Sequence, residues 1–172
     1  MSSSIEPRIV EFGPYRVIGM RCVGNNARNE FADLWGASGG FLSRMHEVAR
    51  PEGAAGIAFG LCRCVPGVTD GTFEYIAAAP AAADAAVPDG MIAALIAAGT
   101  YAAFPVAALS ELMAAWGAVG PWLAAHPEWQ AYCGYPSAQD CDCAHHPAFE
   151  LYPETFATDG RLSVYVPIRP RG

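Results

Sequence analysis

The stretch AFELYPE, residues 148–154, places a carboxylate inside a segment with the composition of a buried strand. Phe149, Leu151 and Tyr152 are large apolar or aromatic residues of the kind that favour half-buried strands. Successive side chains of a strand point to opposite faces, so Glu150 and Tyr152 share one face and Phe149 lies on the other. A carboxylate among apolar groups is costly unless it is paired, so the sequence predicts a special environment for Glu150.

The segment around Glu150 has a weaker counterpart about ninety residues earlier. FGLC at 59–62 matches FELY at 149–152, which pairs Gly60 with Glu150. At the same spacing, the strand-like segment TFEYIAAAP at 72–80 matches LSVYVPIRP at 162–170, and this alignment pairs Tyr75 with Tyr165. A third match joins FGPYRVIGM at 12–20 to AAGTYAAFP at 97–105. Three matches in the same order indicate an internal duplication.

Each half also carries one segment of helical character with a central Trp, at about 27–48 and 106–125. In the second segment apolar residues recur at the spacing of one buried helical face, namely Leu109, Leu112, Met113, Trp116 and Val119. This helix is expected to end near Gly120 and Pro121 or to resume beyond them. The last two strands of each half are joined by turn-rich segments that contain Asp-Gly, at 64–72 and 152–161.

Each half therefore reads β–α–β–β, and the sequence predicts an α+β fold built from two copies of this unit with antiparallel sheets. We expect one domain over residues 1–172, with half-repeats at about 5–80 and 90–170 and an extended connector, AAAPAAADAAVPDG, at 77–90. Half-units of this size leave an apolar sheet face to be covered. The halves should therefore pack together and leave a groove along their pseudo-two-fold axis.

Composition narrows the possible partners. Ten Lys and Arg against seventeen Asp and Glu give a formal charge of −7, which disfavours nucleic acid but not cationic small molecules. The N-terminal residues lack the features of a signal segment, and the apolar run at 92–98 is too short to span a bilayer, so we expect a cytoplasmic protein without membrane contact. We expect no cofactor, because the sequence contains no phosphate-binding loop, nucleophile elbow or zinc-protease motif.

A cluster of soft metal ligands lies just before the AFELYPE stretch: Cys133, Cys141, Cys143, His145 and His146. These residue types suit tetrahedral zinc, but their spacing is not that of a common zinc site. A surface loop that carries these residues without metal is the alternative that we favour, and its nearness to Glu150 suggests a lid over the groove as a further option.

The order of these segments resembles the GyrI-like effector-binding domains over about residues 7–168. The resemblance rests on PRIVEFGPYRVIGMR at 7–21, a Trp-bearing helix, AAGTYAAF at 97–104, FELYPE at 149–154 and the final LSVYVPI at 162–168. The family fold is a duplicated β–α–β–β unit, found in multidrug-responsive regulators, in a gyrase inhibitor and in stand-alone proteins. With no helix-turn-helix segment ahead of Pro7, the chain is similar to the stand-alone members.

The resemblance implies that Glu150 lies at the floor of an aromatic groove that binds apolar, flat, cationic xenobiotics, as in multidrug regulators. The aromatic residues expected around it are Trp35, Tyr75, Tyr101, Trp116 and Tyr152. Stacking and cation–π contacts with their rings would hold such a ligand.

Three alternatives stay open. Stand-alone family members that open strained cyclopropane rings suggest a hydrolase, with Glu150 as general base and Tyr101 polarising the leaving group. A likeness to the gyrase inhibitors suggests a protein partner instead. Glu150 would have no functional role if it faced solvent or paired with an Arg, and Glu30 and Glu74 are further candidate pocket acids.

Overall fold

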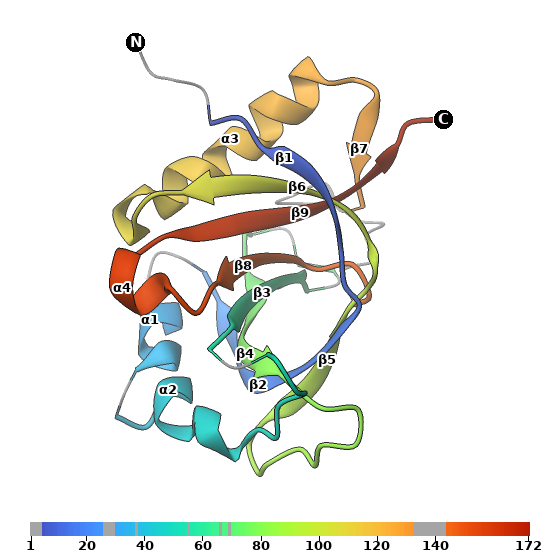
Figure 1. The fold of residues 1–172 in the computed structure, drawn as a ribbon. Coiled ribbons are helices and arrows are strands. Elements are labelled where there is room, and N and C mark those ends of the chain that lie inside the picture. The colour runs from blue at the N-terminus through green and yellow to red at the C-terminus, as the bar shows by residue number, and fades with distance from the viewer. Residues whose placement is uncertain are drawn as a thin grey trace.

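The computed structural model describes residues 5–25, 30–36, 38–54, 56–65, 67–68, 70–132 and 144–172. Its strands form a curled antiparallel sheet with helices packed on its outer side (Figure 1). The strands are β1 Arg8–Phe12, β2 Tyr15–Gly24, β3 Ala58–Cys64, β4 Phe73–Pro80, β5 Ile92–Ile96, β6 Gly99–Val106, β7 Trp129–Ala131, β8 Ala148–Tyr152 and β9 Leu162–Pro170. The helices are α1 Glu30–Trp35, α2 Phe41–Arg44, α3 Leu112–Ala125 and α4 Phe156–Asp159, with short 3₁₀ turns η2 Met45–Glu47 and η3 Leu109–Glu111.

The strand order reveals the duplication. Across the sheet it reads β1-β6-β9-β8-β3-β4-β2-β5, and β7 pairs with β9 at the side. Reading the order from the other end exchanges each strand with its counterpart in the other half. The predicted α+β class with two related units is therefore confirmed, although the halves join edge to edge, through β3 and β8, into one sheet.

The first strand of each half was not predicted. β1 pairs with β6 of the second half, and β5 pairs with β2 of the first half. Each half is thus β–β–α–β–β, and the halves exchange their first strands. These two exchanged strands tie the halves together at both edges of the sheet.

The sequence alignment of β4 with β9 proves wrong by three residues. Gly60 pairs with Ala77 across β3 and β4, whereas its counterpart Glu150 pairs with Val164 across β8 and β9. Ala77 therefore corresponds to Val164, and Tyr75 does not correspond to Tyr165. Because an odd shift in a strand reverses its faces, Tyr75 and Tyr165 lie on opposite sides of the sheet.

The helical segment predicted at about 27–48 is broken in the structure. α1 ends at Trp35, and α2 begins at Phe41. Between them Gly39 has a φ of 84°, and a side chain at Gly40 would collide with the backbone of Gly36. Backbone of this kind requires glycine and does not continue a helix.

In the second half α3 continues through Pro121 to Ala125. Trp116 and Val119 are buried against the sheet, as predicted. The prediction is wrong for Leu109 and Met113, whose side chains are 54% and 58% exposed. Both belong to the apolar face of the helical segment, but they line a pocket beside the sheet instead of the core.

The core lies on both faces of the sheet. On the helix side, α1 and α2 cover residues of β2 and β4 such as Ile18 and Ala77, while α3 covers Phe104 and Val164 of β6 and β9 (Figure 1). The opposite face holds a separate cluster that includes Phe59, Tyr101 and Phe149. No described helix has the length and apolar content needed to cross a bilayer.

The interpretation of residues 77–90 as a connector is wrong at its start. Ala77–Pro80 complete β4, where they are buried. Ala81 and Ala85 are also buried, in the cluster beneath α1 and α2. At one point, Gly19 of β2, the backbone of β2 comes too close to that of Ala77 in β4 to leave room for a side chain.

A substitution at Gly19 tests this close approach of the two backbones. A Cβ at Gly19 would overlap the backbone carbonyl oxygen of Ala77, which cannot rotate away. We expect Gly19→Ala to lower the free energy of unfolding by about 1–3 kcal/mol, measured by urea denaturation. Gly117→Ala is the matched control, because a Cβ there meets open space on α3 and should stabilise the helix by about 0.5–1 kcal/mol. Equal effects of the two substitutions would contradict the packing described.

Candidate functional site

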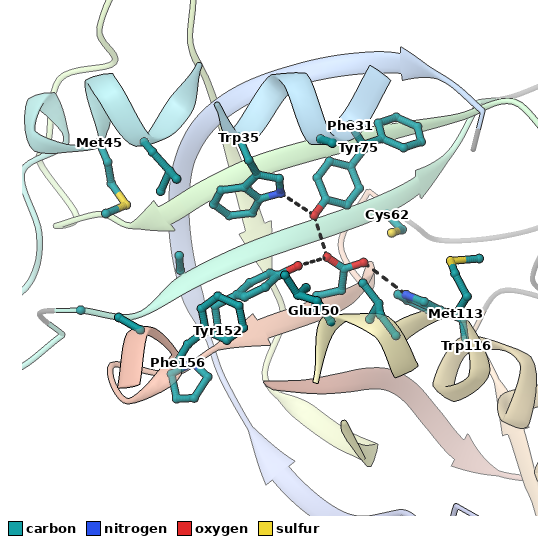
Figure 2. A pocket seen from close by; sticks show the side chains of 18 of the residues that line it. Phe31, Trp35, Met45, Cys62, Tyr75, Met113, Trp116, Glu150, Tyr152 and Phe156 are labelled. Atoms are coloured by element: carbon teal, nitrogen blue, oxygen red, sulfur yellow. Dashed lines mark hydrogen bonds between the residues drawn. The ribbon is translucent and has the colours of Figure 1, made fainter. Parts of the chain in front are cut away.

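A pocket of about 540 Å³ opens beside the junction of the two halves. The first half contributes α1, α2, η2 and the pocket-facing residues of β3 and β4, and the second contributes η3, α3, β8 and α4 (Figure 2). Aromatic and aliphatic side chains form nearly all of its wall. The lining residues are Phe31, Ala32, Trp35, Leu42, Met45, Gly56, Ala58, Cys62, Phe73, Tyr75, Leu109, Leu112, Met113, Trp116, Glu150, Tyr152, Pro153, Glu154, Phe156 and Ala157.

Glu150 lies at the inner end of this pocket and is only 6% exposed. Its Oε2 accepts hydrogen bonds from the hydroxyls of Tyr75 and Tyr152, each at 2.7 Å. Its Oε1 accepts a hydrogen bond from Trp116 Nε1 at 3.2 Å (Figure 2). The alternation expected for AFELYPE thus holds, with Phe149 and Glu150 on opposite faces of β8.

The network extends one step further into the first half. Trp35 Nε1 on α1 donates to the Tyr75 hydroxyl at 2.8 Å, and that hydroxyl in turn donates to Glu150. Two indoles and two phenols from four elements therefore converge on one carboxylate. These neutral donors satisfy the buried polar atoms without supplying a positive charge.

Gly60 makes room for this network. It lies directly opposite Glu150 in the pairing of β3 with β8, the junction of the two halves. A Cβ at Gly60 would overlap the Tyr75 hydroxyl and would lie 2.7 Å from Glu150 Oε2. The carboxylate of one half thus occupies the space that glycine leaves in the other.

Burial controls the ionisation of the groups around Glu150. It raises the pKa of Glu150 above its ordinary value of 4.5, although the hydrogen bonds from Tyr75, Tyr152 and Trp116 oppose this shift. Burial, followed by the neighbouring Glu150 charge, also raises the pKa of Tyr75 and Tyr152. Both phenols therefore stay protonated and remain hydrogen-bond donors. The same two causes raise the pKa of the Cys62 thiol, which also stays protonated.

Tyr101 is the predicted site residue that the structure places elsewhere. It is fully buried on the opposite face of the sheet, where its ring contacts Phe149 and Tyr165. Its hydroxyl donates to the carbonyl of Ala97 at 2.6 Å, and burial raises its pKa to about 12. Since β6 directs Tyr101 away from the helix side, its prediction as a member of the Glu150 cage, or as a catalytic phenol, is corrected.

The other candidate acids and ligands either have different partners or lie outside the described residues. Glu74 is buried on the face opposite Tyr75 and pairs with Arg21 and Arg63, and the side chain of Glu30 is outside the described residues. Cys133, Cys141 and Cys143 also lie outside them, so the zinc hypothesis stays a hypothesis. Of its two histidines, His146 stacks on Tyr132 at 3.9 Å. Among the described residues no group of three or more metal ligands comes together.

Sequence reasoning missed part of the pocket wall. Phe31, Met113 and Phe156 line the pocket and were not expected there (Figure 2). Met113 lies on the same helix as Trp116, and the helical spacing of the two residues indicated an apolar face. That face was predicted to be part of the core, whereas Met113 lines the pocket. Glu154, in the same AFELYPE stretch as Glu150, adds a second acid to the lining.

The fold and pocket define the class of protein. A duplicated α+β sheet of this kind is the fold of the GyrI-like effector-binding domains, as the sequence resemblance implied. The family model of the integron-associated effector binding protein, Cass2, matches residues 8–168, so the chain belongs to this family. A comparison with curated protein sequences gives no significant match.

Solved structures share the fold. SAV2435, in a structure bound to tetraphenylphosphonium, is 16% identical, with a TM-score of 0.64 over 95% of this chain and 94% of that one. An integron cassette protein from the mobile metagenome of Vibrio cholerae is 14% identical, with a TM-score of 0.58 over 95% and 96% of the two chains. A Staphylococcus aureus MU50 protein described as a putative bacterial transcription regulation protein is 16% identical, with a TM-score of 0.56 over 96% and 99%.

Burial of Glu150 makes stability depend on pH. A raised pKa in the folded protein stabilises it below the ordinary pKa of the carboxyl, and this contribution is lost as pH rises through the folded-state value. We expect wild type to lose stability relative to Glu150→Gln as pH rises from about 4.5, by up to about 1.4 kcal/mol per unit. Urea denaturation of both proteins across this range measures the difference. A constant difference, or one that moves in favour of wild type, would show that burial does not disfavour the ionised carboxylate.

Proposed function

We propose that the protein binds apolar aromatic organic cations, including xenobiotic compounds, in the Glu150 pocket. The observation that carries this proposal is the charge of the pocket. Among the described residues that line it are Glu150 and Glu154, but no Lys, Arg or His. The buried carboxylate therefore has hydrogen-bond donors but no positive counter-charge among the lining residues.

A bound monocation would supply the positive counter-charge that Glu150 lacks among the described lining residues. Opposite charges attract more strongly in an apolar site than in water, so a cation that enters the pocket favours the ionised carboxylate. The rings of Trp35, Trp116 and Phe31 line the pocket, and aromatic faces attract cations and stack on flat ligands. A volume of about 540 Å³ suits a ligand of drug size.

The comparisons support the same class of ligand. Tetraphenylphosphonium, the compound bound to SAV2435, is an apolar cation surrounded by aromatic rings. The family to which this chain belongs is described by effector binding. The formal charge of −7 also favours the approach of cations.

The geometry favours binding over ring-opening hydrolysis. The phenol first considered for polarising a leaving group, Tyr101, donates to Ala97 in a different core cluster. Oε2 of Glu150 already accepts two hydrogen bonds, so its acceptor positions are occupied by the phenols and not by a water molecule. The arrangement therefore offers little to a proton-transfer step that would need Tyr101 beside Glu150.

Tetraphenylphosphonium is the probe for this proposal. We expect it to quench the fluorescence of Trp35 and Trp116, which both line the pocket. Glu150→Gln removes the counter-charge at nearly constant size and should weaken binding by about 10- to 100-fold, or about 1.4–2.8 kcal/mol, measured by calorimetry. Tetraphenylborate, of similar shape and opposite charge, should not bind.

Glu11→Gln is the matched control for this experiment. Glu11 makes an exposed hydrogen bond with Thr100 and is absent from the pocket lining, so its substitution removes one negative charge elsewhere. Tetraphenylphosphonium affinity should stay within about twofold of wild type in this variant. Equal losses in the two variants, or unchanged affinity in Glu150→Gln, would remove Glu150 from the binding site.

Binding should also depend on pH through Glu150. Its pKa is raised in the free protein, and a cation stabilises the ionised form. The affinity for tetraphenylphosphonium should therefore fall as pH drops through this pKa, by up to about tenfold per unit. Glu150→Gln should have a much flatter profile, and wild-type affinity that does not fall on acidification would contradict the role of the carboxylate.

A further inference from the structure

The hydrogen bonds to Glu150 occupy most of the acceptor positions of its carboxylate and leave few for a ligand. Oε2 accepts from the hydroxyls of both Tyr75 and Tyr152 at 2.7 Å, and the backbone at Gly60 lies close behind it. A carboxylate oxygen has about two good acceptor positions. The two phenols therefore use the acceptor positions of this oxygen.

Oε1 is the oxygen with remaining capacity. It accepts from Trp116 Nε1 at 3.2 Å, which leaves one acceptor position. The Tyr75 hydroxyl both donates to Glu150 and accepts from Trp35, so it too is largely used. The hydrogen-bonded groups around Glu150 thus leave few free acceptor positions beside its charge.

We propose that the hydroxyls of Tyr75 and Tyr152 make this pocket selective for cations that have no N–H donors. Quaternary ammonium, phosphonium and N-alkylated heteroaromatic ions would be preferred over a primary ammonium ion on the same carbon skeleton. This inference rests on the proposed function and specifies the chemistry of its ligand.

The physical reason is the cost of removing water. A primary ammonium group has three N–H donors, which are bonded to water before binding. Buried beside Glu150, these donors would compete for the one position on Oε1 and for the lone pairs of Tyr152. Donors left without a partner in an apolar site are costly, whereas a quaternary ion loses no such hydrogen bonds.

A matched pair of naphthylmethyl cations tests the selectivity. Calorimetry at about pH 8, where a primary amine is still mostly protonated, compares the naphthylmethyl-trimethylammonium ion with the naphthylmethyl-ammonium ion. We expect wild type to bind the quaternary ion at least about tenfold more tightly. Added methyl groups also favour the quaternary ion by their apolar area, so this ratio alone does not isolate the phenols.

Comparison of wild type with Tyr152→Phe separates the effect of the phenol from the effect of the methyl groups. It keeps the ring and frees one acceptor position on Oε2, so the preference for the quaternary ion should fall by about tenfold. The effect of the methyl groups is the same in both proteins and cancels. Tyr75→Phe is the second variant should Tyr152→Phe not fold. Tyr165→Phe is the control, since Tyr165 stacks on Phe149 on the opposite face, and it should keep the wild-type ratio.

The outcomes separate this inference from the proposed function. A wild-type preference below about twofold, or an unchanged ratio in both Tyr152→Phe and Tyr75→Phe, would overturn the selectivity while cation binding stands. A preference that shifts equally in Tyr165→Phe would also overturn it, because that residue does not touch the carboxylate. Failure of wild type to bind tetraphenylphosphonium and both naphthylmethyl cations would overturn the proposed function, and this inference with it.

Discussion

The structure around the pocket depends on one buried carboxylate held by neutral donors. Glu150 accepts hydrogen bonds from two phenols and one indole, which makes its burial tolerable without neutralising its charge. A second buried carboxylate of this sheet, Glu74, is instead paired with two basic residues, Arg21 and Arg63. No basic residue lies among the described residues of the pocket lining, and this is the basis of the proposal that a bound cation supplies the positive charge.

Duplication explains how such a site can be built. The two halves meet at β3 and β8, where Gly60 of one copy faces Glu150 of the other. Related positions thus carry different residues, one supplying the charge and the other the space for it. The helices of both copies add an indole to the network, because Trp35 reaches Tyr75 and Trp116 reaches Glu150 directly. A symmetric scaffold in this way produces an asymmetric pocket.

Strand alternation and the repeat could be predicted from the sequence, since both depend on local pattern. They gave the α+β class, the special position of Glu150 and its correspondence to Gly60. The exchange of β1 and β5 between the halves could not be predicted, because short edge strands carry no signal of their partner. Tyr101 was misplaced because a resemblance identifies a residue but does not fix the face of its strand. Leu109 and Met113 were read as core because helical periodicity does not distinguish a core from an apolar pocket.

Proton release on ligand binding tests the central claim most directly. Calorimetric titration of tetraphenylphosphonium in buffers of different ionisation enthalpy counts the protons exchanged. If Glu150 is the counter-charge, wild type releases a fraction of one proton at a pH near the raised pKa of this carboxyl, and Glu150→Gln releases none. Binding of the cation with no proton release at any pH near this value, or with the same release in the variant, would contradict the account.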